Sequence, residues 1–187
     1  MRRKETKNIK RSLNHYLKKP SFIGLLLVIF FCGQYCYDNI PEREIFNTNE
    51  VRVIDGDSIA LGKLRIRLQG IDAPELKQEC KKIKSEKPYM CGEVAKDYLV
   101  KLIDNRTIEC TNEGLDRYQR QLAYCYIGKI NLNSEMVRSG NAVAYSQYDK
   151  SFLNEEQEAK LNKVGMWGSI FDYPSKWRNE SRSKLDK

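Results

Sequence analysis

The sequence has almost no histidine: His15 is the single one among 187 residues, and it lies in a basic segment that precedes the first apolar run. This scarcity excludes a Ser-His-Asp triad, a histidine-ligated metal site and a histidine general base from the rest of the chain. Any proton acceptor there must be a carboxylate, a lysine, a tyrosine or a cysteine.

The sequence also carries little net charge after its first 20 residues. The formal net charge is +8, and residues 1–20 contain eight Lys or Arg and one acid, Glu5, so this leader carries +7 of the total. The remaining residues carry +1, and the overall basicity therefore says little about what the folded part binds. A nucleic-acid site in the body must depend on a few well-placed cations.

The sequence has only one long apolar run, and its length is at the lower limit for a helix that crosses a membrane. Phe22–Cys32 is wholly apolar or small, and the uncharged stretch around it covers residues 21–37. A spanning helix needs about 20 residues and tolerates about 17. Bases precede this segment and acids follow it, so the positive-inside rule puts the N-terminus in the cytoplasm and the body outside.

Two interpretations of residues 21–37 remain open, a transmembrane signal anchor and a cleaved signal peptide. We favour the anchor, because the leader is long for a signal peptide and no small-x-small cleavage site follows. The body is then held at the membrane, in the periplasmic or extracellular space. Cleavage would make it a secreted protein.

Composition divides the chain into five segments: a basic cytoplasmic leader (1–20), the membrane or signal segment (21–37), a polar linker (38–48), a globular domain (49–172) and a polar tail (173–187). Alternation predicts extended segments at 50–54, 58–61, 64–71, 106–110, 121–127 and 142–145, and helical spacing predicts helices at 93–104, 133–138 and 152–164. We expect a lysine-rich mobile loop at 75–88 and a frayed tail after 176. Short strands with helices on one side indicate an α+β fold, a five-stranded β-barrel with about three packed helices.

The body contains an even number of cysteines, which agrees with export. Four cysteines allow three pairings, and we favour Cys80 with Cys91, which closes a loop, and Cys110 with Cys125, across neighbouring strands. Zinc binding is disfavoured, because the local spacing of a Cys-x-x-Cys pair is missing. Free structural thiols are the remaining alternative.

Three short blocks carry the charged residues on which a function can be built: IDGDS at 54–58, RLQGIDAPE at 67–75 and DRYQR at 116–120. A hairpin turning at Gly62-Lys63 would set Ser58 opposite Arg67 and bring Asp57 close to the Arg67 guanidinium. Strict alternation puts these two side chains on opposite faces, so a bulge or a strand end must re-aim one of them.

These blocks suit metal-assisted cleavage of a phosphodiester. Asp57 and Asp72 are candidate ligands of a hard cation, calcium or magnesium, and the carbonyl of Ala73, which precedes a proline, is a third. Glu75 is the candidate base or water-orienting group. Two arginines, Arg67 and Arg120, can donate paired hydrogen bonds to phosphate oxygens.

The ordered set VIDGDSIAL, IRLQGIDAPE, DRYQRQLAY, NSEMVRSGNAVAY and EAKLNKVGMW resembles the thermonuclease, or staphylococcal nuclease-like, family over residues 51–167. The resemblance implies an OB-fold barrel with packed helices and a Ca²⁺-dependent nuclease that acts on DNA and RNA. It assigns calcium binding to Asp57, Asp72 and the Ala73 carbonyl. It assigns catalysis to Glu75, Arg67 and Arg120. Tyr118 and Tyr145 match nucleotide-contacting positions, and Arg117 beside the first is a further substrate-binding candidate.

The sequence departs from that pattern at three points. Ala73 replaces a threonine, Gln119 replaces a small residue before Arg120, and the lysine-rich loop with Cys80 and Cys91 is atypical. None of these removes a catalytic group. We expect a monomer with a nucleic-acid substrate; the alternatives are a non-catalytic OB-fold module that binds single strands and a surface adhesin that uses the fold as a scaffold.

Overall fold

A computed structural model of the chain describes residues 28–32, 43–46 and 51–185. Contacts divide the chain into two units, Met1–Pro41 and Glu42–Lys187. In the first unit a short helix covers residues 28–32. Within the described ranges, no helix combines the length and the apolar character needed to cross a membrane. The leader, and most of the membrane segment and linker, lie outside the described residues, so those assignments stay predictions.

The central sheet of the second unit is a meander with one parallel partner. Strands β2 (Val51–Val53), β3 (Ser58–Leu61) and β4 (Leu64–Leu68) pair antiparallel in order, and β9 (Gln121–Ala123) pairs parallel with β4. The turn between β3 and β4 lies at Gly62 and Lys63, and Gly62 has a φ of +57°, a left-handed conformation that glycine adopts without strain. The predicted hairpin and its register are confirmed.

The fold is α+β, but hydrogen bonds do not close the predicted five-stranded barrel in the described residues. A second sheet contains β1 (Arg43–Phe46), β8 (Ile108–Thr111), β10 (Cys125–Ile127) and β11 (Ile130–Asn131). The ladder is interrupted at Tyr124, between β9 and β10, because both its N–H and its carbonyl bond to Thr111. The predicted strand at 121–127 therefore serves two separate sheets.

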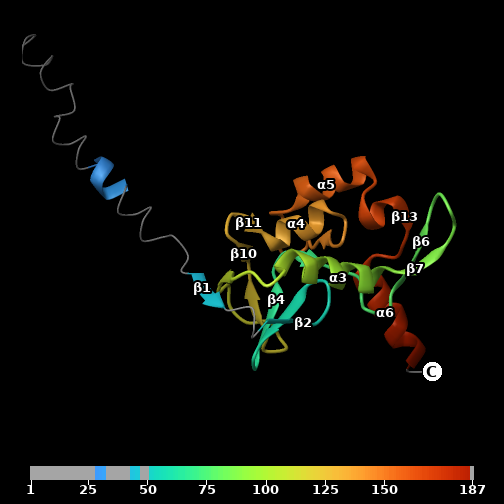
Figure 1. The fold of residues 1–187 in the computed structure, drawn as a ribbon, viewed down its shortest axis with the longest axis horizontal. Coiled ribbons are helices and arrows are strands. Elements are labelled where there is room, and N and C mark those ends of the chain that lie inside the picture. Colours follow the sequence, from blue (N-terminus) through green and yellow to red (C-terminus); the bar gives the residue numbers. More distant parts are fainter. Residues whose placement is uncertain (1–27, 33–42, 47–50, 186–187) are drawn as a thin grey trace, which may run out of the picture. The chain divides into compact units, whose positions relative to one another are not determined.

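Helices cover one side of these strands. Figure 1 shows α3 (Cys91–Ile103) between the strands and the helices α4 (Leu132–Arg138) and α5 (Leu153–Asn162), and α3 packs against both α4 and β2. The 3₁₀ turn η2 (Gly165–Gly168) follows α5. The core is formed by fully buried side chains of the sheets and helices, among them Ile59, Ile66, Leu68, Leu99, Ile108, Leu132 and Met136. This core is the rigid support of the site described below.

Two predictions about irregular segments were wrong. The lysine-rich segment is not an open loop: β6 (Glu79–Lys82) and β7 (Pro88–Met90) form a hairpin that projects from one end of the unit (Figure 1), and β13 (Ser169–Ile170) pairs with β6. The tail is not frayed, since α6 (Pro174–Leu185) is a helix of the same compact unit. The remaining short pair joins β5 (Ile71–Asp72) to β12 (Val143–Ala144).

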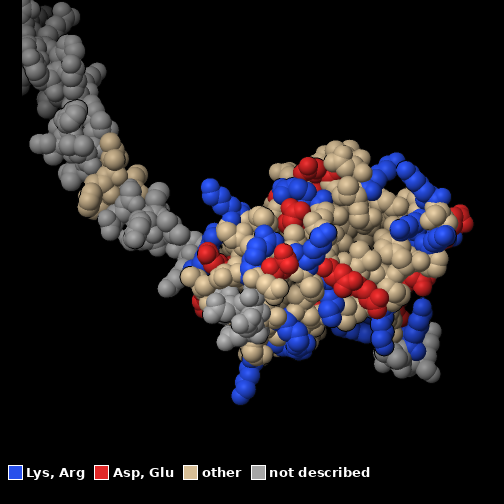
Figure 2. Space-filling view, viewed as in Figure 1, with Lys and Arg blue, Asp and Glu red and all other residues tan. Residues whose placement is uncertain are grey.

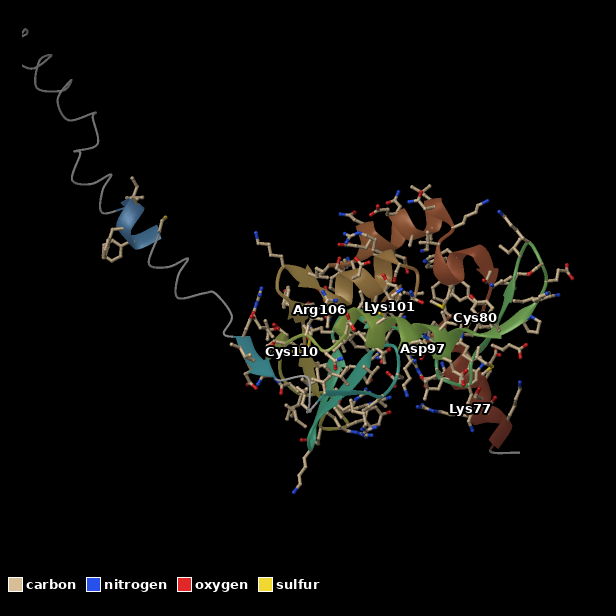
Figure 3. The ribbon with its side chains drawn as sticks, viewed as in Figure 1. Lys77, Cys80, Asp97, Lys101, Arg106 and Cys110 are labelled. Atoms are coloured by element: carbon tan, nitrogen blue, oxygen red, sulfur yellow. A yellow bond between two sulfur atoms is a disulfide. The ribbon has the colours of Figure 1, made fainter. Side chains whose placement is uncertain are left out.

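Both favoured disulfides are present. Cys80 on β6 is bonded to Cys91 at the start of α3, and Cys110 on β8 to Cys125 on β10. The two strand cysteines of the second bond are register partners. Figure 3 shows Cys80 toward the hairpin end of α3 and Cys110 toward its other end. The two disulfides therefore cross-link the chain at opposite ends of the unit.

Candidate active site

Asp57 and Arg67 meet at the open end of the β3–β4 hairpin. Ser58 lies opposite Arg67, and Asp57 comes directly before β3, where its carbonyl accepts a hydrogen bond from the Leu68 N–H at 2.8 Å. Because Asp57 is outside the strand, the alternation of β3 does not fix its side chain. Its carboxylate forms an ion pair with Nη1 of Arg67.

Asp72 reaches the same guanidinium from β5. Nη2 of Arg67 donates to Oδ1 of Asp72 at 3.1 Å and to the carbonyl of Ile71 at 3.0 Å. The side chain of Asp72 is 1% exposed and that of Asp57 is 7% exposed. Two nearly buried acids from separate blocks therefore converge on one arginine.

The electrostatics of Arg67 reflect this crowding. Burial lowers the pKa of Arg67 below its ordinary value, and the positive charges of Arg120 and Arg178 lower it further, against the attraction of Asp72. Two guanidiniums, those of Arg67 and Arg178, thus contact the acidic pair, and the charge of Arg120 also acts on Arg67. Such a concentration of opposite charges in a partly buried place is typical of functional sites.

The close approach of Asp57 to the backbone at Ala73 depends on Gly56. The Ala73 N–H donates to Oδ2 of Asp57 at 2.8 Å. A Cβ added at Gly56 would lie 2.7 Å from the Cβ of Ala73 and 2.8 Å from that of Ala95 on α3. These contacts are too short, so a side chain at position 56 would push Asp57 and Ala73 apart.

The donor atoms here fit a hard divalent cation. Asp57 and Asp72 present carboxylate oxygens, which calcium and magnesium prefer, and their burial beside each other concentrates negative charge. Within the described residues, no group of three or more His, Cys, Asp or Glu side chains is placed to hold a metal ion. The carbonyl of Ala73 stays the predicted third ligand.

Glu75 lies on a tight turn that packs against the start of α3. The Gln78 N–H donates to the carbonyl of Glu75 at 2.7 Å, and Oε1 of Gln78 accepts from the Glu75 N–H at 3.3 Å. A Cβ added at Gly92, on the first turn of α3, would lie 1.8 Å from the carbonyl oxygen of Glu75. The glycine lets the turn lie directly on the helix, which fixes the backbone of Glu75 relative to Asp72.

Arg178 is a site residue that sequence reasoning missed. From α6 its Nη1 donates to Oδ1 of Asp72 at 2.9 Å and to Oε1 of Glu75 at 3.1 Å, and its Nη2 donates to Oδ2 of Asp72 at 3.0 Å. Burial opposes the charged form, but the hydrogen bonds and charges of both acids raise the pKa of Arg178 above its ordinary value. The available signal was Pro174, which is typical of the first position of a helix.

The third block forms a turn that presents Arg120. Oδ1 of Asp116 accepts from the N–H groups of Tyr118 and Arg120, and Nε of Arg120 donates to Oδ2 of Asp116 at 2.7 Å. These hydrogen bonds lower the pKa of Asp116, although its burial acts the other way. Gln119 adopts a φ of +61° within the turn. Arg120 ends this turn and directly precedes β9, in which Leu122 is the register partner of Arg67.

The predicted substrate-binding residues lie at two different places. Tyr118 is 56% exposed, with the guanidinium carbons of Arg117 and Arg120 at 4.7 and 5.5 Å from the centre of its ring. Tyr145 directly follows β12, and its N–H donates to the carbonyl of Gly70. Burial raises the pKa of Tyr145, and the charge of Asp72 raises it further. Tyr145 is therefore a half-buried residue close enough to Asp72 to respond to its charge, whereas Tyr118 is an exposed residue beside Arg117 and Arg120.

A model of the family described as staphylococcal nuclease homologue matches residues 65–169. An uncharacterized endonuclease of Haemophilus influenzae is 32% identical over 177 residues, covering 90% of both chains. A micrococcal nuclease of Shigella flexneri is 30% identical over 78% of this chain and 87% of its own. A probable staphylococcal-like nuclease of rice is 33% identical over 68% of this chain, which spans 32% of the rice protein.

Proposed function

Because the chain belongs to the staphylococcal nuclease homologues and is a nuclease, we propose that it is a calcium-dependent endonuclease that hydrolyses phosphodiester bonds of DNA, RNA or both. The observation that carries this proposal is the meeting of Asp57, Asp72 and Glu75 with two arginines, Arg67 and Arg178, at one place. Oxygen ligands and guanidiniums are together what a reaction at a phosphate needs.

Asp57, Asp72 and the carbonyl of Ala73 would hold the cation, which supplies positive charge beside the phosphate when it is bound. Arg67 lies on β4 and Arg120 directly precedes β9, and these two strands are parallel neighbours. From these positions the two guanidiniums would bind the non-bridging phosphate oxygens and stabilise the charge that builds up as water attacks. Tyr118, Arg117 and Tyr145 would contact the nucleotide around them.

Glu75 is the group that would orient the attacking water and accept its proton, since the described body contains no histidine. Its side chain is 37% exposed, so water reaches it, whereas its backbone is fixed on α3 by the turn to Gln78. A fixed backbone with an accessible carboxylate suits a general base.

The approach of a polyanionic substrate would be favoured by the β6–β7 hairpin. Lys and Arg side chains gather over this end of the unit (Figure 2), and the hairpin lysines, Lys81, Lys82, Lys84 and Lys87, are all exposed. These charges would raise the association rate with nucleic acid at low ionic strength.

We propose further that the nuclease works outside the cytoplasm, tethered by residues 21–37. Two disulfides support export, because such bonds persist in oxidising compartments and are rare in the cytosol. Protease added to intact spheroplasts should degrade the nuclease. In untreated cells the nuclease should be recovered in the membrane fraction. Recovery from the culture medium would instead mean that the segment is cleaved, and protection from protease would contradict export.

The proposed activity is tested by nicking of supercoiled plasmid and cleavage of single-stranded RNA with the full-length protein in detergent. We expect activity with calcium and its loss in EDTA. Arg67→Ala should reduce kcat/KM about 10²–10³-fold, as loss of a preorganised donor does, and Glu75→Gln about 10²–10⁴-fold, as loss of a general base does.

Arg65→Ala is the matched control, because Arg65 is an exposed arginine two positions earlier on the same strand. It should leave activity within about twofold of wild type, since no step uses it. A folded protein that binds single strands but cleaves nothing with calcium would contradict the proposal and favour a non-catalytic binding module.

A further inference from the structure

The helix α6 brings a third arginine to the carboxylates of the site. The guanidinium of Arg178 donates to both oxygens of Asp72, at 2.9 and 3.0 Å, and to Glu75 at 3.1 Å. The Asp72 side chain is 1% exposed and that of Arg178 is 26% exposed. The contact is therefore a largely enclosed two-pronged pair, which is far more specific than a surface ion pair between flexible side chains.

The helix is anchored to the turn that carries Glu75. Gln78, which is fully buried, accepts from the Glu75 N–H and donates through Nε2 to the carbonyl of Asp172 at 2.7 Å. Asp172 lies two residues before the start of α6 at Pro174, which is itself buried. The buried side chain of Gln78 thus links the segment before α6 to the turn of Glu75. This link fixes the position of α6, and with it that of Arg178, relative to the site.

We propose that Arg178 is a positioning residue of the active site, which orients Glu75 against Asp72 and competes with the divalent cation for the oxygens of Asp72. The inference rests on the proposed function, in which Asp72 is a cation ligand and Glu75 the base. It assigns two effects of opposite sign to one side chain: tighter orientation of the base and weaker binding of the cation.

Competition follows from the acceptor capacity of Asp72. A carboxylate offers about four lone-pair sites, and Asp72 already accepts one hydrogen bond from Arg67 and two from Arg178. A cation must share or replace these donors, and it is also repelled by the guanidinium charge. Removing Arg178 frees two acceptor sites and removes one positive charge.

Orientation follows from the position of Glu75. Its side chain is 37% exposed, and among the described residues Arg178 donates to its carboxylate. Without this donor the carboxylate can sample other rotamers, although its backbone stays fixed. Loss of a residue that orients a catalytic group typically lowers activity about 10–100-fold.

The test compares Arg178→Ala and Arg178→Lys with wild type, as full-length proteins in detergent, by calorimetric titration with calcium chloride and by cleavage kinetics. Arg178→Ala should bind calcium about tenfold more tightly, the size of effect that one nearby charge has on an ionic equilibrium. Its kcat should fall about tenfold or more while KM stays within about twofold, because Arg67 and Arg120 still hold the phosphate. Arg178→Lys should bind calcium nearly as wild type does but keep the low kcat, since an ammonium cannot bridge both carboxylates.

Lys176→Ala is the matched control, because it removes one positive charge from the same helix at a side chain that contacts Asp172 and Glu180 and neither acid of the site. It should match wild type in both measurements. A simultaneous loss of calcium affinity and kcat in Arg178→Ala would mean a structural role, and a rise in kcat would mean an inhibitory one; either result overturns the inference. Wild type that neither binds calcium nor cleaves would remove the proposed function itself, whereas an active wild type with an indistinguishable Arg178→Ala would overturn only the role of Arg178.

Discussion

At the scale of single residues, the site depends on two glycines as much as on its charged side chains. Gly56 allows Asp57 to contact the backbone at Ala73, and Gly92 allows the turn at Glu75 to lie on α3. Neither position needs a left-handed backbone, since neither is among the glycines with positive φ. What these glycines supply is space, and Asp57 and Glu75 are placed by the close backbone contacts that follow.

Gly92→Ala is therefore expected to lower both activity and stability. The added methyl group would lie 1.8 Å from the carbonyl oxygen of Glu75, so the turn must move, and a displacement of about 1 Å costs about 10²-fold in rate. Overpacking of this kind costs about 1–3 kcal/mol of stability. The measurements are cleavage kinetics and urea unfolding.

Gly62→Ala provides the comparison, because nothing lies within 4 Å of its added Cβ. Its cost is limited to the left-handed backbone, about 1–2 kcal/mol. Folded Gly62→Ala should cleave at the wild-type rate. Equal rates for wild type and Gly92→Ala would show that the turn is not held as tightly as the contact implies.

At the scale of elements, the β6–β7 hairpin is tied to the site by the Cys80–Cys91 disulfide. The N–H of Cys91 donates to the carbonyl of Gln78 at 3.1 Å, and Gln78 holds both the turn of Glu75 and the start of α6. The bond therefore closes the segment that contains the catalytic turn. The Cys110–Cys125 bond joins β8 to β10 in the second sheet, away from these contacts.

The two disulfides should differ in what their removal does. Replacing either pair by serine should cost about 2–4 kcal/mol of unfolding free energy, because the unfolded chain gains freedom. We expect the Cys80→Ser/Cys91→Ser variant also to lose about tenfold in kcat, as misplacement of catalytic groups does. The Cys110→Ser/Cys125→Ser variant should keep kcat per folded molecule. Urea unfolding, and cleavage kinetics at a temperature where both variants are folded, distinguish the two variants. Equal kcat values would contradict the link between the Cys80–Cys91 bond and the site.

At the scale of the whole molecule, a partly buried polar contact links the strands to the helices. The hydroxyl of Tyr124, at the junction of the two large sheets, donates to Oδ2 of Asp149, which precedes α5. Burial and this hydrogen bond raise the pKa of Tyr124 to about 12. The ring of Tyr124 also packs edge-on against Phe152. The contact thus makes the stability of the fold depend on pH in the alkaline range.

Stability should fall as the pH rises from 10 toward 12. The unfolded chain releases the proton of Tyr124 at about pH 10, the ordinary value, whereas the folded protein keeps it until about pH 12. The contribution of this raised pKa is therefore complete below pH 10 and is lost above it. Urea unfolding between pH 8 and pH 11 measures the slope, and Tyr124→Phe should make it shallower. An unchanged slope in that variant would assign the alkaline loss to other groups.

Local patterns in the sequence were enough for the β3–β4 hairpin and for the pairing of Cys110 with Cys125. A two-residue turn and the strand period of two leave one register, in which Ser58 lies opposite Arg67. The open loop assigned to the lysine-rich segment was wrong for a physical reason. Its first strand pairs with β13, which lies about 90 residues further along the chain, and local sequence does not encode that contact.

The sequence by itself determined the family and singled out Asp57, Arg67, Asp72 and Glu75 as candidate site residues, because the residue types and their spacing indicate that chemistry. Only the tertiary structure decided that Arg178 joins them, since it comes from a helix that lies more than 100 residues beyond Asp72 and Glu75. Local spacing sets which side chains share a face of one element. The packing of the distant helix α6 beside the turn of Glu75 depends on the burial of Gln78 and Pro174 in the folded chain.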